Sequence, residues 1–215
     1  MADQDDEDED DVDDDDEHSA ALLGAMKRSW ASDAHFFANS GKEERERWVV
    51  QNFLTTLTMT FALEEIKSCV QSSKVDVEFR DARFQIKEIV TPGSRRTAEI
   101  KAIAQQVEAA KTLSETIGPG FVYDTPTVAN GYELVRDQAK QLAEDPRYSN
   151  VKGSIDLLIY VTRTRASIAR KTVHSDAELS ATGWRSVCYL AGQHAVVLFA
   201  QIDAPDFLRS ASNGI

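Results

Sequence analysis

The sequence contains only two cysteines, Cys69 and Cys188, among its 215 residues. They are too few and too far apart to form a disulfide framework or a cysteine-rich zinc site. His35, His174 and His194 also lack partners at the spacing of zinc ligands. The composition therefore argues against a disulfide-stabilised protein and against a zinc protein.

Long apolar runs and several well-known catalytic motifs are also missing. No apolar stretch approaches the 18 residues that a membrane span needs, and the N-terminus is acidic where a signal peptide is basic. The sequence has no glycine-rich phosphate loop, no serine-centred elbow and no Cys–His constellation. We therefore expect a cytoplasmic protein without a membrane contact.

Negative charge is plentiful but concentrated at one end of the chain. Residues 2–17 hold 13 of the 36 acidic residues and no basic ones, which leaves 23 acidic against 24 basic residues elsewhere. The formal net charge of −12 thus belongs to the acidic tail, and the rest of the chain is close to neutral. The total charge does not exclude a nucleic-acid partner.

The acidic tail has almost nothing to bury, so it cannot offset the conformational entropy lost on folding. We predict a disordered segment over residues 1–18 and a single domain over residues 19–215. The tail would serve as a solvating segment. Alternatively, it mimics nucleic acid and binds a basic cleft of its own chain, or it docks on a basic partner.

Hydrophobic periodicity predicts an α/β protein. Helical spacing indicates helices over residues 19–40, 42–57, 94–117 and about 128–145. Alternation predicts a short strand with Phe61 and Leu63 and then a hairpin over residues 75–90. A strand over residues 154–162, apolar on both faces, reads as central, and two further strands flank Gly192. This order predicts a mixed central β-sheet flanked by helices.

The hairpin "VDVEFRDARFQIKEIV" carries an unusual polar set. With a tight turn at Asp81 and Ala82, Phe79 faces Phe84, Asp76 faces Lys87, and Glu78 faces Gln85. Side chains alternate between the faces of a sheet, so the four polar residues share one face. Val75, Val77, Phe79, Phe84 and Ile86 share the other. A solvated polar face with an Asp76–Lys87 ion pair would explain the same pattern.

The aspartate, the turn and the Gln85-Ile86-Lys87 segment resemble the PD-(D/E)xK nuclease superfamily, with "VD" where that family often has Pro-Asp. The predicted helix, three-strand meander, helix and strand resemble its restriction-endonuclease-like core. The stretches "KEERERWVVQNFL", "VEFRDARFQIKEI" and "GWRSV…VLFAQIDAPDFLR" are also similar to a family of uncharacterised bacterial proteins labelled as endonucleases. That likeness spans roughly residues 35–209 and excludes the tail.

The resemblance implies a metal-dependent phosphodiester hydrolase. Asp76 would be the principal ligand of Mg²⁺, with Mn²⁺ as the alternative ion, and Gln85 would offer its amide oxygen without charge. Glu78 on the same face would restore negative charge, a point the family pattern does not supply. Lys87 would orient the attacking water and offset charge in the transition state.

Further residues follow from position and from the resemblance. The superfamily often adds a glutamate from the preceding helix, and Glu46 lies on the inward stripe of that helix. Phosphate contacts supply much of nonspecific DNA affinity, so basic residues near a cleft are candidates. The candidate DNA contacts are Arg95 and Arg96 at a helix start and Arg163 and Arg165 after the buried strand.

Three functions stay open on the sequence. The first is a Mg²⁺-dependent endonuclease that acts on nucleic acid, with DNA as the expected substrate. The second is a catalytically weak or inactive module on the same fold that binds nucleic acid or a protein partner, with access regulated by the acidic tail. In the third, the polar face of the hairpin is a homodimer contact.

Overall fold

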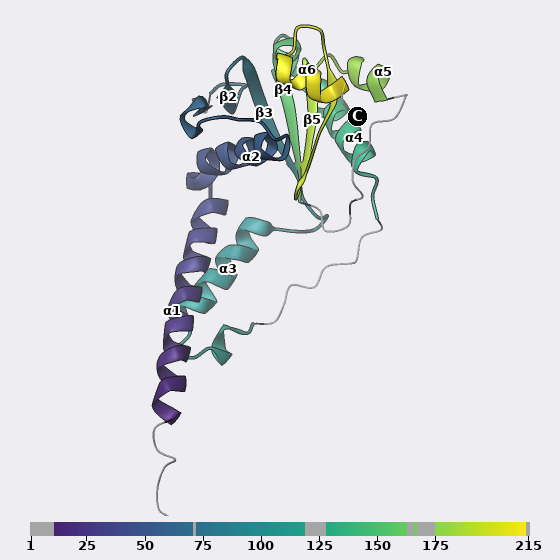
Figure 1. Ribbon diagram of the computed structural model, residues 1–215. Coiled ribbons are helices and arrows are strands. Elements are labelled where there is room, and N and C mark those ends of the chain that lie inside the picture. Colours follow the sequence, from purple (N-terminus) through teal and green to yellow (C-terminus); the bar gives the residue numbers. More distant parts are fainter. Residues whose placement is uncertain (1–10, 71, 119–127, 163–165, 167–174, 214–215) are drawn as a thin grey trace, which may run out of the picture. The chain divides into compact units, whose positions relative to one another are not determined.

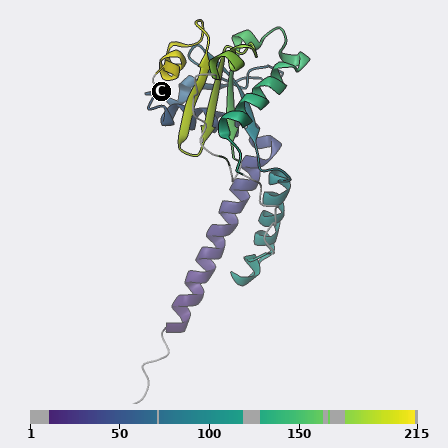
Figure 2. The same ribbon diagram turned by 90° about the vertical axis from the view of Figure 1, so that its right-hand side faces the viewer.

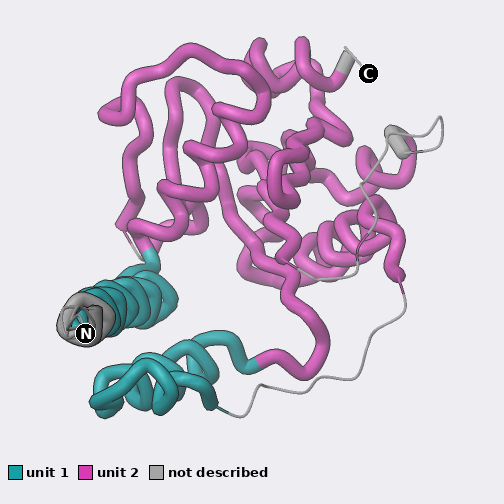
Figure 3. Tube along the Cα trace, turned by 60° about the horizontal axis from the view of Figure 1, so that its bottom comes forward, with its two compact units in different colours: residues 1–42, 95–123 teal, residues 43–94, 124–215 magenta. Residues whose placement is uncertain are grey.

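The computed structural model describes residues 11–70, 72–118, 128–162, 166 and 175–213 (Figure 1). The chain divides into two compact units, coloured separately in Figure 3. The helical unit comprises Met1–Lys42 and Arg95–Tyr123, and the sheet unit comprises Glu43–Ser94 and Asp124–Ile215. Each unit is described by itself below.

The helical unit pairs α1 (Asp11–Phe37) with α3 (Arg96–Ala109). The guanidinium of Arg96 lies 4.4 Å from the centroid of the Phe37 ring, and Thr97 Oγ1 donates to the Phe37 carbonyl at 3.1 Å. Both helices were predicted, but α3 is shorter than expected, and a 3-10 turn at Ser114–Thr116 takes up part of the remainder.

Helix α1 begins at Asp11, inside the segment 1–18 that the sequence predicts to be disordered. Residues 1–10 lie outside the described part of the chain, whereas 11–18 are helical. Negative charge in the first turn of a helix is favoured by the positive end of the helix dipole, which is compatible with a helix that begins at Asp11.

The sheet unit is built on one six-stranded mixed sheet with spatial order β1-β2-β3-β4-β5-β6. The β3–β4 and β4–β5 pairs are parallel, and the other three pairs are antiparallel. The hairpin of β5 and β6 forms one edge, drawn yellow-green in Figure 2. The strands are Ile66–Ser68, Val77–Phe79, Ala82–Ile89, Asp156–Val161, Ser186–Ala191 and His194–Ala200. The predicted α/β fold with a mixed central sheet is confirmed.

Helices cover both faces of this sheet. Apolar residues of α2 (Lys42–Thr56) and α6 (Asp206–Asn213) pack with Phe84, Leu158 and Cys188 in one cluster. Residues of α4 (Gly131–Ala143) and α5 (Ser175–Ser180) pack with Leu157 and Ile159 in another. Consecutive residues of β4 thus enter opposite clusters, which confirms that this strand is buried on both faces.

The predicted strand containing Phe61 and Leu63 is wrong. Residues 63–65 form a 3-10 turn, and β1 begins only at Ile66. The Glu65 carboxylate accepts the backbone N–H of Ala62 at 2.8 Å and so closes that turn. Phe61 instead packs edge-to-face on Phe79, with ring centroids 6.0 Å apart.

The predicted hairpin register is wrong by two residues. Val77 faces Phe84, Glu78 faces Arg83, and Phe79 faces Ala82, so the turn consists of Arg80 and Asp81. Arg80 has a positive φ of 52°, and its guanidinium is held by Glu65 and by the Thr60 carbonyl at 2.9 and 3.0 Å. These tertiary contacts stabilise a backbone conformation that arginine rarely adopts. Because the register shifts by two residues, each side chain of β2 and β3 still lies on the face of the sheet that alternation predicts.

Candidate active site

The Asp76 carboxylate lies at the start of β2 and binds two groups of β3. Its Oδ2 accepts the backbone N–H of Ile86 at 2.8 Å and the side-chain Nε2 of Gln85 at 2.5 Å. The structure therefore brings Asp76 and Gln85 into direct contact, whereas the sequence predicts only that they share one face. The predicted facing pairs of Asp76 with Lys87 and Glu78 with Gln85 do not form.

Backbone bonds explain how Asp76 reaches this position. Its N–H donates to the Phe84 carbonyl at 2.8 Å, and its carbonyl accepts the N–H of Cys69 at 2.9 Å. The Asp76 carboxylate takes the Ile86 N–H, and the regular β2 strand begins one residue later. Val75 consequently packs in the cluster of α4, not with Val77 as the alternation predicts.

Glu78 lies between two basic residues on neighbouring strands. Lys67 of β1 and Arg83 of β3 are its register partners, and all three side chains are exposed. Directly opposed side chains in a sheet lie roughly 5 Å apart, which favours attraction between opposite charges. This arrangement explains Glu78 as a cross-strand partner of these cations, in place of the predicted neighbour Gln85.

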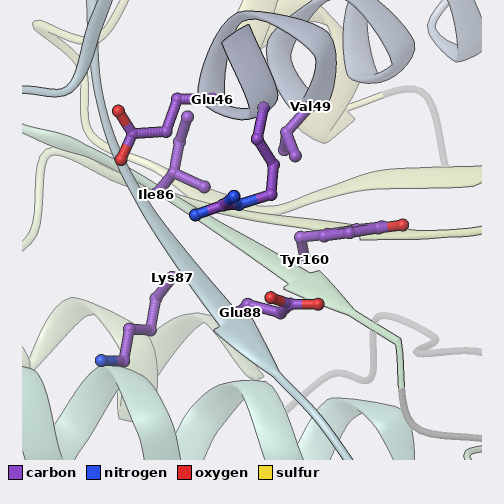
Figure 4. Close-up of a pocket in the computed structure, with 7 residues that line it drawn as sticks. Glu46, Val49, Ile86, Lys87, Glu88 and Tyr160 are labelled. Carbon is purple, nitrogen blue, oxygen red and sulfur yellow. The ribbon is translucent and has the colours of Figure 1, made fainter. Parts of the chain in front are cut away.

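Glu46 and Lys87 contribute to one pocket of about 230 Å³ between α2 and the strands β3 and β4. Glu46 is buried, with 9 % of its surface exposed, and Lys87 is exposed. In Figure 4 the side chains of Glu46, Ile86 and Glu88 lie on one side of β3, and Lys87 extends from the other. The residues that line the pocket are Arg45, Glu46, Val49, Ile86, Lys87, Glu88 and Tyr160.

Negative charge surrounds the half-buried thiol of Cys69, which lies beside the start of β2. Burial raises the pKa of Cys69, and the charges of Glu78, Asp76 and, more weakly, Glu46 raise it further. Arg83 acts in the opposite direction. The thiol is therefore held protonated, and Cys69 is not an activated nucleophile.

The oxygen ligands of the predicted metal site are few. Mg²⁺ commonly takes one or two carboxylates from a protein and completes its shell with water and phosphate oxygens. Asp76 supplies a carboxylate, but Gln85 turns its N–H₂ group toward it and would have to reverse its amide to offer oxygen. Within the described ranges, no three His, Cys, Asp or Glu side chains could hold a metal ion together. These residues fit Mg²⁺ only as a one-carboxylate site completed by substrate and water.

The substitution Gln85→Glu tests this geometry. In EDTA it should lower the free energy of unfolding by about 1–3 kcal/mol, because the Asp76 bond is lost and two carboxylates meet. Mg²⁺ should recover part of the loss if the pair binds the ion. Urea unfolding with EDTA and with Mg²⁺ measures both effects, with the uncharged Gln85→Met as the control. A loss in EDTA no larger than that of Gln85→Met would contradict the contact.

The candidate DNA contacts fall in different parts of the chain. Arg95 precedes α3, and its backbone N–H donates to Glu99 Oε1 at 2.6 Å. The Arg96 side chain is stacked on Phe37 within the helical unit. Arg163 and Arg165 lie outside the described residues. All four assignments stay predictions.

Several pocket residues were missed in the sequence. Arg45 and Val49 are four residues apart on α2 and so share a face of the helix, and this spacing could have predicted that both line the pocket. Glu88 follows Ile86 on the same face of β3 by alternation. Tyr160 could not be found this way, because only the parallel register places it beside Glu88.

Comparison with known proteins gives one family and one similar structure. The matching family model covers residues 18–215 and is described as "Putative endonuclease, protein of unknown function (DUF1780)". A protein of unknown function from Pseudomonas aeruginosa strain PAO1, described as belonging to the monooxygenase superfamily, has a similar structure. It is 25 % identical with a TM-score of 0.57, over 90 % of this chain and 92 % of its own.

No curated protein matches the chain. The family match confirms the predicted likeness to uncharacterised proteins labelled as endonucleases. It does not name the PD-(D/E)xK superfamily, so that assignment stays a prediction. No helix in the described part of the chain is long and apolar enough to cross a membrane.

Proposed function

We propose that this protein, which belongs to the DUF1780 family of endonuclease-labelled proteins of unknown function, hydrolyses phosphodiester bonds in nucleic acid, with DNA as the expected substrate. The observation that carries the proposal is the contact of the Asp76 carboxylate with Gln85 and the Ile86 N–H. This contact joins the two halves of the motif across nine positions of sequence.

Asp76 and Lys87 would have different roles in the hydrolysis. Asp76 is held by two N–H donors, which fix the orientation of its carboxylate, and this carboxylate would bind the metal ion beside the reacting phosphate. Lys87 is exposed two residues beyond Gln85 on the same face of β3, where its ammonium can hold an attacking water and offset charge that develops on the phosphate. Bound Mg²⁺ would supply a hydroxide nucleophile near neutral pH and neutralise phosphate charge.

The direct test is a cleavage assay on the full chain. Labelled double-stranded DNA, single-stranded DNA and RNA are incubated with Mg²⁺, with Mn²⁺ or with EDTA. We expect cleavage with metal and none with EDTA. Absence of cleavage from all three substrates with either ion would overturn the proposal.

A second candidate function is a nucleic-acid-binding module without catalysis. It is favoured by the orientation of Gln85, which donates to Asp76 and brings no second carboxylate. Salt-dependent binding without cleavage would select this alternative. Deletion of residues 2–17 tests whether the acidic tail regulates access to the site. Tighter DNA binding after the deletion would indicate that the tail competes with nucleic acid.

A further inference from the structure

The pocket between α2 and β3 has an unusual mixture of side chains for a nucleic-acid site. Two carboxylates, of Glu46 and Glu88, line it together with Arg45 and the Tyr160 ring. It lies toward the carboxyl ends of the parallel strands β3 and β4, where α/β proteins commonly bind ligands. Neither the motif of Asp76, Gln85 and Lys87 nor the family description accounts for Arg45, Glu88 and Tyr160.

Charge decides which part of a nucleic acid could enter. Carboxylates accept hydrogen bonds and repel phosphate, and the two of Glu46 and Glu88 outnumber the one guanidinium that lines the pocket, that of Arg45, so a group with N–H donors is favoured over a phosphate beside Glu88. The Glu88 carboxylate is oriented, because its Oε1 accepts the hydroxyl of Thr162 at 2.8 Å. A nucleobase with an exocyclic amine has the matching donor, as in the pairing of glutamate with the cytosine N4 amine.

Aromatic rings stand beside the carboxylates. The rings of Trp48 and Tyr160 meet edge-to-face with centroids 5.9 Å apart, and 41 % of the Trp48 surface is exposed. Exposed aromatic faces stack on unpaired bases without regard to their sequence. The pocket of about 230 Å³ is smaller than typical sites for drug-sized ligands, which suits one base better than a larger group.

We propose that this pocket takes one unpaired base that carries an exocyclic amine, so that the substrate is single-stranded or locally unpaired nucleic acid. The inference rests on the proposed function, because Lys87 of the motif borders the same pocket, although its side chain extends from the other side of β3. A base within a duplex has to leave the stack before it can enter.

Binding can be measured without catalysis. Fluorescence anisotropy in EDTA compares labelled oligonucleotides of about 12 nucleotides: oligo(dC), oligo(dT), an abasic strand and a duplex. We expect oligo(dC) to bind at least about 5-fold more tightly than oligo(dT), because thymine has a carbonyl where cytosine has its amine. The abasic strand and the duplex should bind more weakly than oligo(dC).

Two variants assign the preference to this pocket. Glu88→Gln should bring the ratio of the oligo(dC) and oligo(dT) affinities close to one, whereas Glu43→Gln, which removes an exposed charge elsewhere on α2, should leave it unchanged. Trp48→Ala should weaken binding of oligo(dC) by about 5- to 100-fold and leave abasic binding unchanged. Thermal unfolding verifies that each variant is folded.

The outcomes separate this inference from the proposed function. Equal affinities of the wild-type protein for oligo(dC), oligo(dT) and the abasic strand overturn the base pocket, while metal-dependent cleavage would still support a nuclease. A preference that survives both Glu88→Gln and Trp48→Ala overturns its assignment to these residues. Failure to bind or cleave any nucleic acid overturns both proposals.

Discussion

Replacing Asp156 by alanine is expected to lower the free energy of unfolding by about 3–5 kcal/mol, because a buried charged partner is left uncompensated. Asp156 is fully buried at the start of β4. Its carboxylate accepts the Arg185 guanidinium, the Ser186 hydroxyl at 2.8 Å and the Arg83 backbone N–H at 2.8 Å. One side chain thus joins the N-terminal ends of β3, β4 and β5.

The Arg185 side chain is itself only 12 % exposed, so the loss of Asp156 leaves its charge in a poorly solvated place. Urea unfolding of Asp156→Ala measures the effect. Glu178→Ala is the matched control, because Glu178 pairs with Lys140 at 3.0 Å on the surface, where ion pairs contribute little. Equal stabilities of the two variants would contradict the buried network.

A double substitution distinguishes the ion pair from simple packing. Asp156→Leu combined with Arg185→Met removes both charges, so it should be less destabilising than the sum of the two single changes. Additive effects would mean that the two side chains stabilise the sheet independently. That result would conflict with the contacts between Asp156 and Arg185 in the structure.

The second large effect is expected at Lys87. If the protein is a nuclease, Lys87→Ala should lower the cleavage rate by roughly 100-fold or more, the size seen when one preorganised group that stabilises the transition state is removed. Lys87 is exposed, so the free energy of unfolding should hardly change. Single-turnover cleavage with saturating protein measures the chemical step apart from binding.

The control for Lys87 is Lys67→Ala, an exposed lysine of β1 in the same sheet. It removes the same charge, so it should weaken DNA binding at most modestly and keep the rate of the bound complex. Lys87→Arg should retain part of the rate because the positive charge remains. A Lys87→Ala protein that cleaves as fast as Lys67→Ala would exclude the proposed role.

Sequence patterns predicted much of the secondary structure but fewer of the local details. The period of two in residues 75–90 fixed which side chains of β2 and β3 share a face, because side chains alternate in any strand. The same pattern could not fix the register, since a shift by two residues preserves every face. The sequence also did not predict helix α6, and it placed the first strand near Phe61 although β1 begins at Ile66. Short elements carry too little periodicity to be located precisely.

The sequence by itself determined the α/β class and the central buried strand, because these follow from alternation and chain connectivity. Only the tertiary structure decided the turn at Arg80, held by Glu65, and the pairing of Asp156 with Arg185. Likewise, only the parallel register brought Tyr160 beside Glu88. Each of these contacts joins residues distant in sequence, so its energy arises only when the chain has folded.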